Sequence, residues 1–244
     1  MIAEEVPAGS RLADIGSDHA LLPAYLAERG TIVNAVAGEV NPGPFEAAAK
    51  QVRSSGLEHR IDVRRGDGLE VIAPGEVDVI TIAGMGGALI VSILEAGKPK
   101  LEGVTRLVLQ PNVGESLVRA WLLEHNWALI GERIVEEDDK IYEILTAIAP
   151  GQGDTTNARI YEPLALSGKT MADRNVLLKM GPYLVREASS VWVKKWRFEL
   201  EKLDKICAAL GRSELDASRQ KEDEFRQEMR TIEEVLACTQ KARP

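Results

Sequence analysis

The sequence predicts an α/β fold, a mostly parallel seven-stranded sheet with helices between its strands, followed by a C-terminal, coiled-coil-like helical hairpin. Up to about Pro150, short apolar runs alternate with segments of helical spacing. Three of the runs are apolar throughout, as in parallel strands that are covered on both faces. In the last third of the chain, apolar residues recur at steps of three and four. We therefore expect two domains, residues 1–155 and 156–244.

The individual elements of the first domain follow from these runs. Seven strands are expected, at residues 11–15, 33–40, 61–65, 77–83, 107–109, 128–135 and 141–148. Four helices are expected between them, at residues 23–29, 44–54, 88–96 and 115–124. Right-handed crossovers would bring the carboxyl ends of the parallel strands to one edge of the sheet.

The last two strands distinguish between two architectures. A tight charged turn at residues 136–140 joins them and favours a hairpin. Five parallel strands followed by an antiparallel pair form the class I, Rossmann-like methyltransferase fold. A dinucleotide dehydrogenase normally continues with a sixth parallel strand.

Two apolar seams predict the helical hairpin of the second domain. One runs from Trp196 to Leu210 and the other from Phe225 to Thr239. A turn at residues 211–213 lies between them, and a polar, glycine-containing linker at residues 151–157 precedes this domain.

Composition excludes several classes of protein. The sequence shows no signal peptide, and its longest uncharged stretch, Val79–Leu94, is shorter than the ~20 residues of a membrane span. Cys207, Cys238 and the three histidines lack metal-ligand spacing. We expect a cytoplasmic protein with reduced thiols, no bound metal and no membrane partner, and we expect a monomer.

The net charge of −8 is unevenly distributed. Residues 1–150 hold 13 basic and 23 acidic side chains, a net charge of −10, whereas residues 151–244 hold 17 and 15, a net charge of +2. Such a chain has no global attraction for nucleic acid. A polyanion would have to bind a local basic surface, and the second domain is where that surface is expected.

An acidic residue and a glycine turn close the first predicted strand, at Asp14 and Gly16. Gly16 lacks a Cβ, so the backbone can turn sharply and approach a ligand closely. Ser17, Asp18 and His19 stand where a dinucleotide-binding loop has small residues. The added acidic groups would repel phosphates and suit a cofactor with cationic centres. S-adenosylmethionine, which carries a sulfonium and an ammonium group, is such a cofactor.

The next three strand ends extend this pattern. Glu39 closes the second strand, where an acidic residue can accept hydrogen bonds from both hydroxyls of a ribose. Asp67 and Gly68 follow the third strand, and Asp67 could accept from an adenine amino group. A glycine-rich turn, residues 84–87, follows the fourth. Each feature alone could be a surface charge or a common turn, but together they predict a nucleoside-type cofactor.

Five motifs resemble those of the TrmK family, bacterial tRNA (adenine-N1)-methyltransferases that act on the adenosine at tRNA position 22. They are DIGSDHA at residues 14–20, GEVNPGP at 38–44, GDGL at 66–69, IAGMGG at 82–87 and LQPN at 109–112. The resemblance covers nearly the whole chain. One departure is Leu21, where the family often has an aromatic residue. The expected cofactor-binding residues are Asp14, Gly16, Ser17, His19, Glu39, Val40, Asn41, Asp67, Gly68, Ala83, Gly84 and Met85.

The methyl transfer that the resemblance implies needs no strong general base. Adenine N1 has a lone pair at neutral pH, so proximity and alignment would provide most of the rate enhancement. The base must be extruded or presented unpaired. Gln110 and Asn112 could accept from its N6 amino group, or could simply cap their loop. Asp18 could accept as well, or offset the charge that forms on the methylated base.

The tRNA partner is expected on the first part of the helical domain. Phosphate contacts with neighbouring tryptophans, Trp192 and Trp196, would suit RNA, although mixed charges on a helix are often only solvated and tryptophans can belong to a seam. The expected contacts are Lys179, Arg186, Lys194, Lys195 and Arg197.

Two alternatives stay open at this point. One is a methyltransferase for another RNA site or for a small molecule. The other is a nucleotide-binding regulatory module whose helical hairpin binds a protein partner. Cofactor binding without turnover on any RNA would favour the second.

Overall fold

The computed structural model describes residues 1–151, 156–166, 170–212 and 215–241. The chain divides into two compact units, Met1–Arg133 with Tyr142–Asn157, and Ile134–Ile141 with Ala158–Pro244. Most of the predicted linker, residues 152–155, and Ser213 of the predicted helical turn lie outside the described residues. The domain boundary at residues 155 and 156 therefore stays a prediction.

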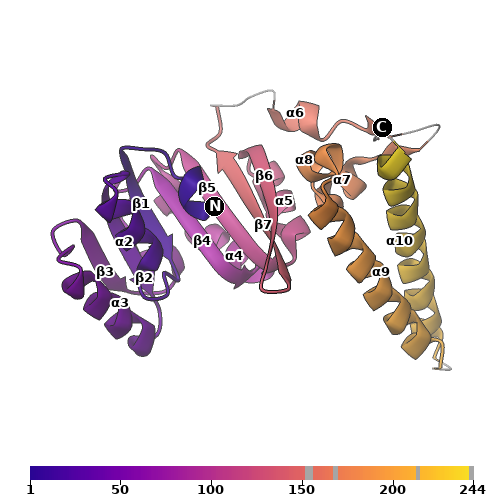
Figure 1. Ribbon diagram of the computed structural model, residues 1–244, viewed down its shortest axis with the longest axis horizontal. Helices are drawn as coiled ribbons and strands as arrows, with labels where there is room; N and C mark the ends of the chain where they lie inside the picture. The colour runs from indigo at the N-terminus through magenta and orange to yellow at the C-terminus, as the bar shows by residue number, and fades with distance from the viewer. Residues whose placement is uncertain (152–155, 167–169, 213–214, 242–244) are drawn as a thin grey trace. The chain divides into compact units, whose positions relative to one another are not determined.

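The seven predicted strands are present and form one sheet in the order β3-β2-β1-β4-β5-β7-β6 (Figure 1). The pairs among β1 to β5 are parallel and β7 pairs with β5 antiparallel, which confirms the expected fold class. The strands are β1 Ser10–Ile15, β2 Ile32–Glu39, β3 Ile61–Arg65, β4 Val79–Gly86, β5 Arg106–Val113, β6 Ala128–Glu137 and β7 Lys140–Ile148.

The four predicted helices of this region are also present, with starts shifted by up to two residues. Among these helices, α2 contacts α3 and α4 contacts α5. Three short helices, α1, η1 and η2, were not predicted because one turn shows no period. The helices are α1 Ile2–Glu5, α2 Leu21–Glu28, α3 Pro42–Ser54, η1 Gly68–Val71, α4 Gly87–Ala96, η2 Lys98–Leu101 and α5 Glu115–Glu124.

Strands β4 and β5 continue further than the sequence predicts. Gln110-Pro111-Asn112 has the composition of a turn, so the expected strand stopped at Leu109. In the structure β5 reaches Val113 because it stays paired with β4, with register shifts around Met85. Bulges of this kind accommodate proline and redirect the chain near functional sites.

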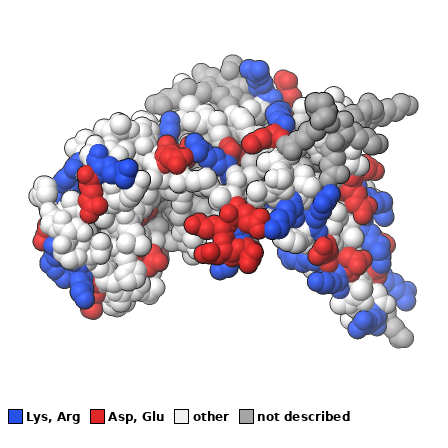
Figure 2. Space-filling view, in the orientation of Figure 1, with Lys and Arg blue, Asp and Glu red and all other residues white. Residues whose placement is uncertain are grey.

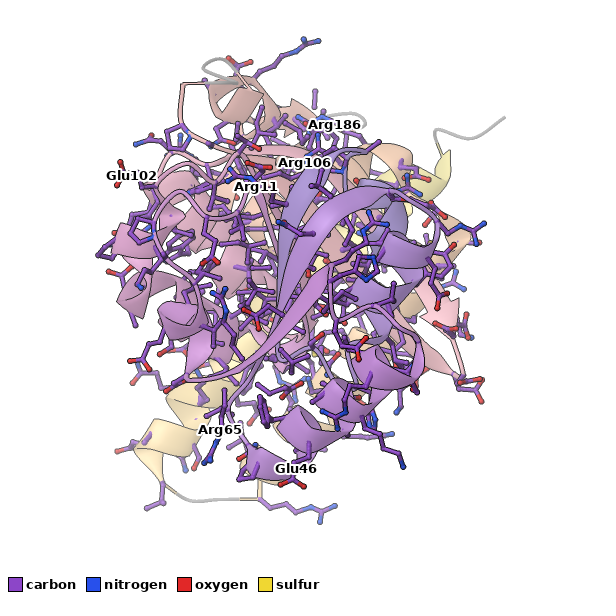
Figure 3. The ribbon with its side chains drawn as sticks, turned by 90° about the vertical axis from the view of Figure 1, so that its left-hand side faces the viewer. Arg11, Glu46, Arg65, Glu102, Arg106 and Arg186 are labelled. Carbon is purple, nitrogen blue, oxygen red and sulfur yellow. The ribbon has the colours of Figure 1, made fainter. Side chains whose placement is uncertain are left out.

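The amino edge of the sheet is held by ion pairs and hydrogen bonds. The Arg11 guanidinium binds the Asp78 carboxylate through Nε and Nη2, and Arg106 donates to the Glu5 carbonyl at 2.9 Å. Figure 3 shows Arg11 and Arg106 near the top of its view, with Arg65, at the end of β3, toward the bottom. The opposite, carboxyl edge is where β1 to β5 end.

The strand hairpin of β6 and β7 forms as the charged turn predicts. Asp138 and Asp139 occupy its two loop positions with φ values of 50° and 59°. Positive φ at both positions is the requirement of a type I′ turn, which matches the twist of the flanking strands. Further along the hairpin, the Arg119 guanidinium of α5 binds the carboxylates of Glu132 and Glu143, and all three side chains are fully buried.

The second unit contains the predicted helical hairpin, formed by α9 and α10. Trp192, Trp196 and Leu203 of α9 pack with Ile232 and Leu236 of α10. No helix among the described residues is long and apolar enough to cross a membrane. The elements of this part are α6 Thr156–Ile160, β8 Leu164–Ala165, β9 Met171–Ala172, α7 Arg174–Met180, α8 Pro182–Glu187, α9 Ser190–Leu210 and α10 Asp216–Lys241.

Candidate active site

The loop between β1 and α2 has an unusual backbone. Gly16 has φ +69°, and the non-glycine residues Asp18, His19 and Ala20 all lie in the left-handed region. Such a conformation costs about 1–2 kcal/mol for each non-glycine residue. Backbone strain of this kind persists only where surrounding contacts impose it, and it clusters at functional sites. Helix α2 begins directly after this run, at Leu21, two residues before its predicted start.

The buried carboxylate of Asp14 holds this loop from beneath. One of its oxygens accepts from the Ser17 hydroxyl at 2.6 Å and the other from the Thr81 hydroxyl of β4 at 2.5 Å. Burial raises the pKa of Asp14, and the two hydrogen bonds partly offset that rise. Asp14 therefore connects β1 with the loop that follows it and with β4. The sequence analysis does not predict the contact with Thr81.

Glu39 fixes the same loop from the end of β2. Its Oε1 accepts from the backbone N–H of Asp18 at 2.6 Å, and its side chain is buried. Burial raises the pKa of Glu39, the hydrogen bond from Asp18 opposes this, and the charges of Asp18 and Asp14 raise it further. Within the described part of the chain no other group donates to Glu39, so one carboxylate oxygen is available to a ligand hydroxyl.

A methionine connects the first loop with the turn after β4. A Cβ at Gly16 would lie 2.2 Å from the terminal methyl carbon of Met85, so Met85 packs directly over Gly16. Gly16 is thus required twice, for its positive φ and for this contact. The structure brings the ends of β1, β2 and β4 together as the sequence predicts.

Two amides clamp the bulge at Gly84. The Gly84 N–H donates to Oε1 of Gln110 at 2.9 Å, and Nδ2 of Asn112 donates to the Gly84 carbonyl at 2.7 Å. The two side chains also bind each other, Gln110 Nε2 to Asn112 Oδ1 at 3.1 Å. The side-chain oxygens of Gln110 and Asn112 both accept hydrogen bonds within the protein, which supports the alternative that these residues cap their loop. A contact of either amide with the target base stays a prediction.

The side chains of Asp18 and His19 are exposed to solvent. The Asp18 side chain is 84 % exposed, and its Oδ1 lies 3.6 Å from Nε2 of His19. Because water screens such an exposed pair, it contributes little to stability. Both groups are free to meet a ligand or the substrate.

The remaining predicted cofactor residues lie along the same edge. Asp67 and Gly68 border a surface pocket of about 240 Å³ together with Leu89 and Ile93 of α4. Three further predicted cofactor-binding residues lie at the ends of β2 and β4. Val40 is exposed, and Asn41 directly precedes the first residue of α3. Ala83 of β4 pairs with Gln110 of β5. Leu89 was not singled out in the sequence because an exposed leucine cannot be told from a core leucine by pattern alone.

Of the five predicted RNA-binding residues, four interact with neighbours in the second unit. Lys179 pairs with Glu228 and Lys194 with Glu136, whereas Arg186 donates to two backbone carbonyls. The Lys195 ammonium lies 5.8 Å from the ring centre of Trp196. Arg197 is exposed, and Figure 2 shows basic and acidic side chains interspersed along α9 and α10.

The tryptophans of this surface belong to the core. Trp192 and Trp196 are 0 % and 4 % exposed, so the seam alternative is the one that the structure supports. The exposed aromatic side chain on α9 is instead Phe198, which the Lys194 ammonium approaches to 5.5 Å. Among the described residues, no group of three or more His, Cys, Asp and Glu side chains could hold a metal ion.

The chain is similar to several known proteins over most of its length. Residues 12–234 match the family model TrmK, tRNA (adenine(22)-N(1))-methyltransferase. The tRNA (adenine(22)-N(1))-methyltransferase of Bacillus subtilis is 45% identical over 236 residues, covering 96% of this chain and 94% of that protein. The crystal structure of the B. subtilis enzyme superposes with a TM-score of 0.86 at 44% identity, covering 96% and 95% of the two chains. The structure of a putative tRNA (m1A22) methyltransferase from Streptococcus pneumoniae, solved in complex with S-adenosyl-L-methionine, superposes with a TM-score of 0.78 at 40% identity and covers 96% of each chain.

Proposed function

The chain belongs to the family of tRNA (adenine(22)-N(1))-methyltransferases, and from that premise we propose how its carboxyl-edge site performs the reaction. The enzyme transfers a methyl group from S-adenosylmethionine to N1 of adenosine 22 in tRNA. The observation that carries the assignment of the site is the set of acidic side chains at three consecutive strand ends, Asp14, Glu39 and Asp67.

The residues at these strand ends fit the cofactor. Two carboxylates with little access to water, Asp14 and Glu39, create a negative potential that attracts sulfonium and ammonium groups. Gly16 and Gly84 have positive φ, and a Cβ at Gly84 would meet nothing within 4 Å, so the backbone is open to a ligand there. No phosphate-binding glycine loop competes with this assignment.

We assign the contacts by position. Glu39 accepts from the ribose hydroxyls through its available oxygen, and Asp67 accepts from the adenine amino group. Val40 and Asn41 flank the nucleoside, and the loop of Gly16, Ser17 and His19 borders the methionine part.

Asp14 acts through Ser17 and Thr81 and is a positioning residue, since both its oxygens are engaged.

The chain provides orientation rather than acid–base chemistry. The bound cofactor supplies an activated methyl group on its sulfonium sulfur. The clamp of Gln110 and Asn112 fixes the Gly84 peptide, and Met85 over Gly16 fixes the neighbouring wall, so the reacting atoms meet a rigid surface. The exposed carboxylate of Asp18 offsets the positive charge that the base acquires on methylation.

The helical unit supplies the binding surface for the tRNA. Lys194, Arg197 and Phe198 share an exposed face of α9, where cationic and aromatic groups together suit a polynucleotide. Lys179, Arg186 and Lys195 lie in the same unit and complete the proposed set. We propose that the enzyme acts as a monomer in the cytoplasm, where its substrate is found, and mass measurement by light scattering tests the oligomeric state.

Mass mapping of methylated nucleosides tests the reaction. Purified tRNA carrying adenosine at position 22 is incubated with the enzyme and labelled cofactor, then digested and analysed. We expect 1-methyladenosine, and none when guanosine replaces that adenosine. N6-methyladenosine, or label at another position, would indicate a different methyltransferase. Cofactor binding by calorimetry without label in any RNA would indicate the regulatory-module alternative.

A further inference from the structure

Two large aliphatic side chains are exposed at the carboxyl edge of the sheet. Val113, the last residue of β5, is 67% exposed, and Leu117, in the first turn of α5, is 50% exposed. The strand residues before Gln110, Leu107 to Leu109, are by contrast fully buried. Soluble proteins seldom leave neighbouring large apolar side chains exposed beside a functional site unless a ligand covers them.

Val113 borders the glycine-rich turn that follows β4, and Leu117 borders Gly114, whose backbone contacts that turn. Val113 pairs with Gly86, and a Cβ at Gly86 would lie 3.9 Å from Cγ2 of Val113. A Cβ at Gly114 would lie 3.5 Å from Cδ1 of Leu117. The backbones of Gly87 and Gly114 are in close contact, since a Cβ at Gly87 would lie 2.2 Å from the Gly114 carbonyl oxygen. The apolar pair is therefore continuous with the site at Gly84 and Met85.

The polar side chains at this strand end are already engaged. Gln110 and Asn112 hold the Gly84 peptide and each other, which leaves an aliphatic surface as the free part of the β5 end. An aliphatic surface has no donor that could bind adenine N1. The N1 lone pair thus stays available as the nucleophile, whereas a nearby N–H or O–H would compete for it.

Resting on the proposed function, we propose that Val113 and Leu117 form the surface against which the ring of the extruded target adenine lies. Extrusion removes the base from its stack at a cost of a few kcal/mol. Burying the ring and the two aliphatic side chains from water offsets part of this cost. The pair thereby positions the base beside the Gly84 turn without contacting the cofactor.

Substitutions that make the surface polar without changing its size test the proposal. Val113→Thr and Leu117→Gln alter exposed side chains, so the fold is retained, as circular dichroism and unchanged cofactor affinity by calorimetry would show. Val33→Thr is the matched control, because Val33 is 55% exposed and lies at the opposite, amino end of a strand of the same sheet. The kinetic readout is methylation of tRNA with cofactor at saturation.

We expect kcat/KM for tRNA to fall about tenfold in each variant, corresponding to roughly 1.4 kcal/mol of lost apolar contact, and to stay unchanged in V33T. A second readout uses tRNA with 2-aminopurine at position 22, whose fluorescence rises when the base leaves its stack for an aliphatic surface. The rise should occur with wild-type enzyme and V33T and be reduced in both variants.

Three outcomes would overturn the inference while leaving the proposed function intact. The first is kcat/KM within twofold of wild type in V113T and L117Q, and the second is an unchanged 2-aminopurine signal in both. A loss of cofactor affinity in either variant would also contradict it, because the pair would then belong to the cofactor site. Failure of the wild-type enzyme to form 1-methyladenosine in tRNA would instead refute the proposed function itself.

Discussion

At the scale of single residues, the site depends on carboxylates that the fold shields from water. Asp14 and Glu39 each use a carboxylate oxygen to hold the loop after β1, and burial raises the pKa of both. The same desolvation that makes these groups unfavourable in the free protein strengthens their attraction for a cationic ligand. The loop that these carboxylates hold has three consecutive residues in the left-handed region. Because that conformation is unfavourable for non-glycine residues, the loop depends on the hydrogen bonds to Asp14 and Glu39.

Replacing Glu39 by Gln should weaken cofactor binding and stabilise the cofactor-free protein. A hydrogen bond to a charged acceptor is worth about 1.5–3 kcal/mol, so the cofactor Kd should rise by roughly ten- to hundredfold. Calorimetry measures this change. An unaltered Kd in E39Q would contradict the ribose assignment.

The stability effect of E39Q should depend on pH. Because the pKa of Glu39 is raised in the folded state, ionisation costs folding free energy. Wild-type stability relative to E39Q should therefore fall as pH rises from the usual glutamate range through the raised pKa. Thermal unfolding should show E39Q as the more stable protein at neutral pH, and similar stabilities at acidic pH. A constant difference at all pH values would show that ionisation of Glu39 is not the cause.

At the scale of elements, the ends of β4 and β5 act as one unit. The two strands stay paired beyond the point where the sequence suggests a turn, and the bulge at Gly84 is clamped from both sides by side chains of β5. The position of the Gly84 peptide is thus a property of the strand pair rather than of the loop sequence.

Alanine substitutions of Gln110 and Asn112 should be strongly non-additive. Either change releases one side of the Gly84 peptide and leaves the other amide without its partner. We expect each single variant to lower kcat, and the double variant to lose little more than either. A coupling energy of about 0.5–3 kcal/mol from the double-mutant cycle on kcat/KM would support this. Additive losses would mean that the two amides act independently, as separate contacts to the base would.

The buried Arg119 anchors α5 to the strand hairpin of β6 and β7. Arg119→Met would leave Glu132 and Glu143 buried without their cation, at a cost of about 3–5 kcal/mol in unfolding free energy. Urea unfolding measures this cost. Arg133→Met is the matched control, because Arg133 is about half exposed where it pairs with Glu4 and Glu5, and its loss should cost under about 1 kcal/mol. Equal costs for the two variants would refute a special role for the buried cation.

At the scale of the whole molecule, charge separates the two functions. The first 150 residues carry a net charge of −10, which suits a cationic cofactor and opposes RNA, whereas residues 151–244 carry +2. Within the second unit Lys179 and Lys194 are held in ion pairs, so the exposed Arg197 and Phe198 of α9 matter more for RNA binding than the total charge.

Arg197→Ala should weaken tRNA binding and make it less sensitive to salt. Each lost phosphate contact lowers the slope of log K against log salt by about 1. Arg197→Lys keeps the charge and should retain the slope, and the cofactor Kd should stay unchanged in both variants. Filter binding over a range of salt concentrations measures the slopes. A slope in R197A equal to that of wild type would exclude Arg197 from the RNA surface.

The sequence alone determined the strand and helix order and the positions of the acidic and glycine residues at the strand ends. Periodicity and turn composition are local properties, and the right-handed crossover rule converts that order into one shared edge. The motifs of the loop after β1 and of the glycine-rich turn helped to identify the family from sequence, because each motif is a continuous stretch of the chain. Local sequence predicted the ends of helices and strands less accurately, as the continuation of β5 to Val113 shows.

The contacts of each side chain follow from the tertiary structure and could not be predicted from local sequence. The pairing of Thr81 with Asp14, the Met85 contact over Gly16 and the amide clamp on Gly84 join residues that are far apart in the chain. The burial of Trp192 and Trp196 and the exposure of Val113, Leu117 and Phe198 likewise depend on which face of an element meets a neighbour. Local sequence carries no record of these contacts, since an apolar residue has the same pattern whether a protein core or a ligand will cover it.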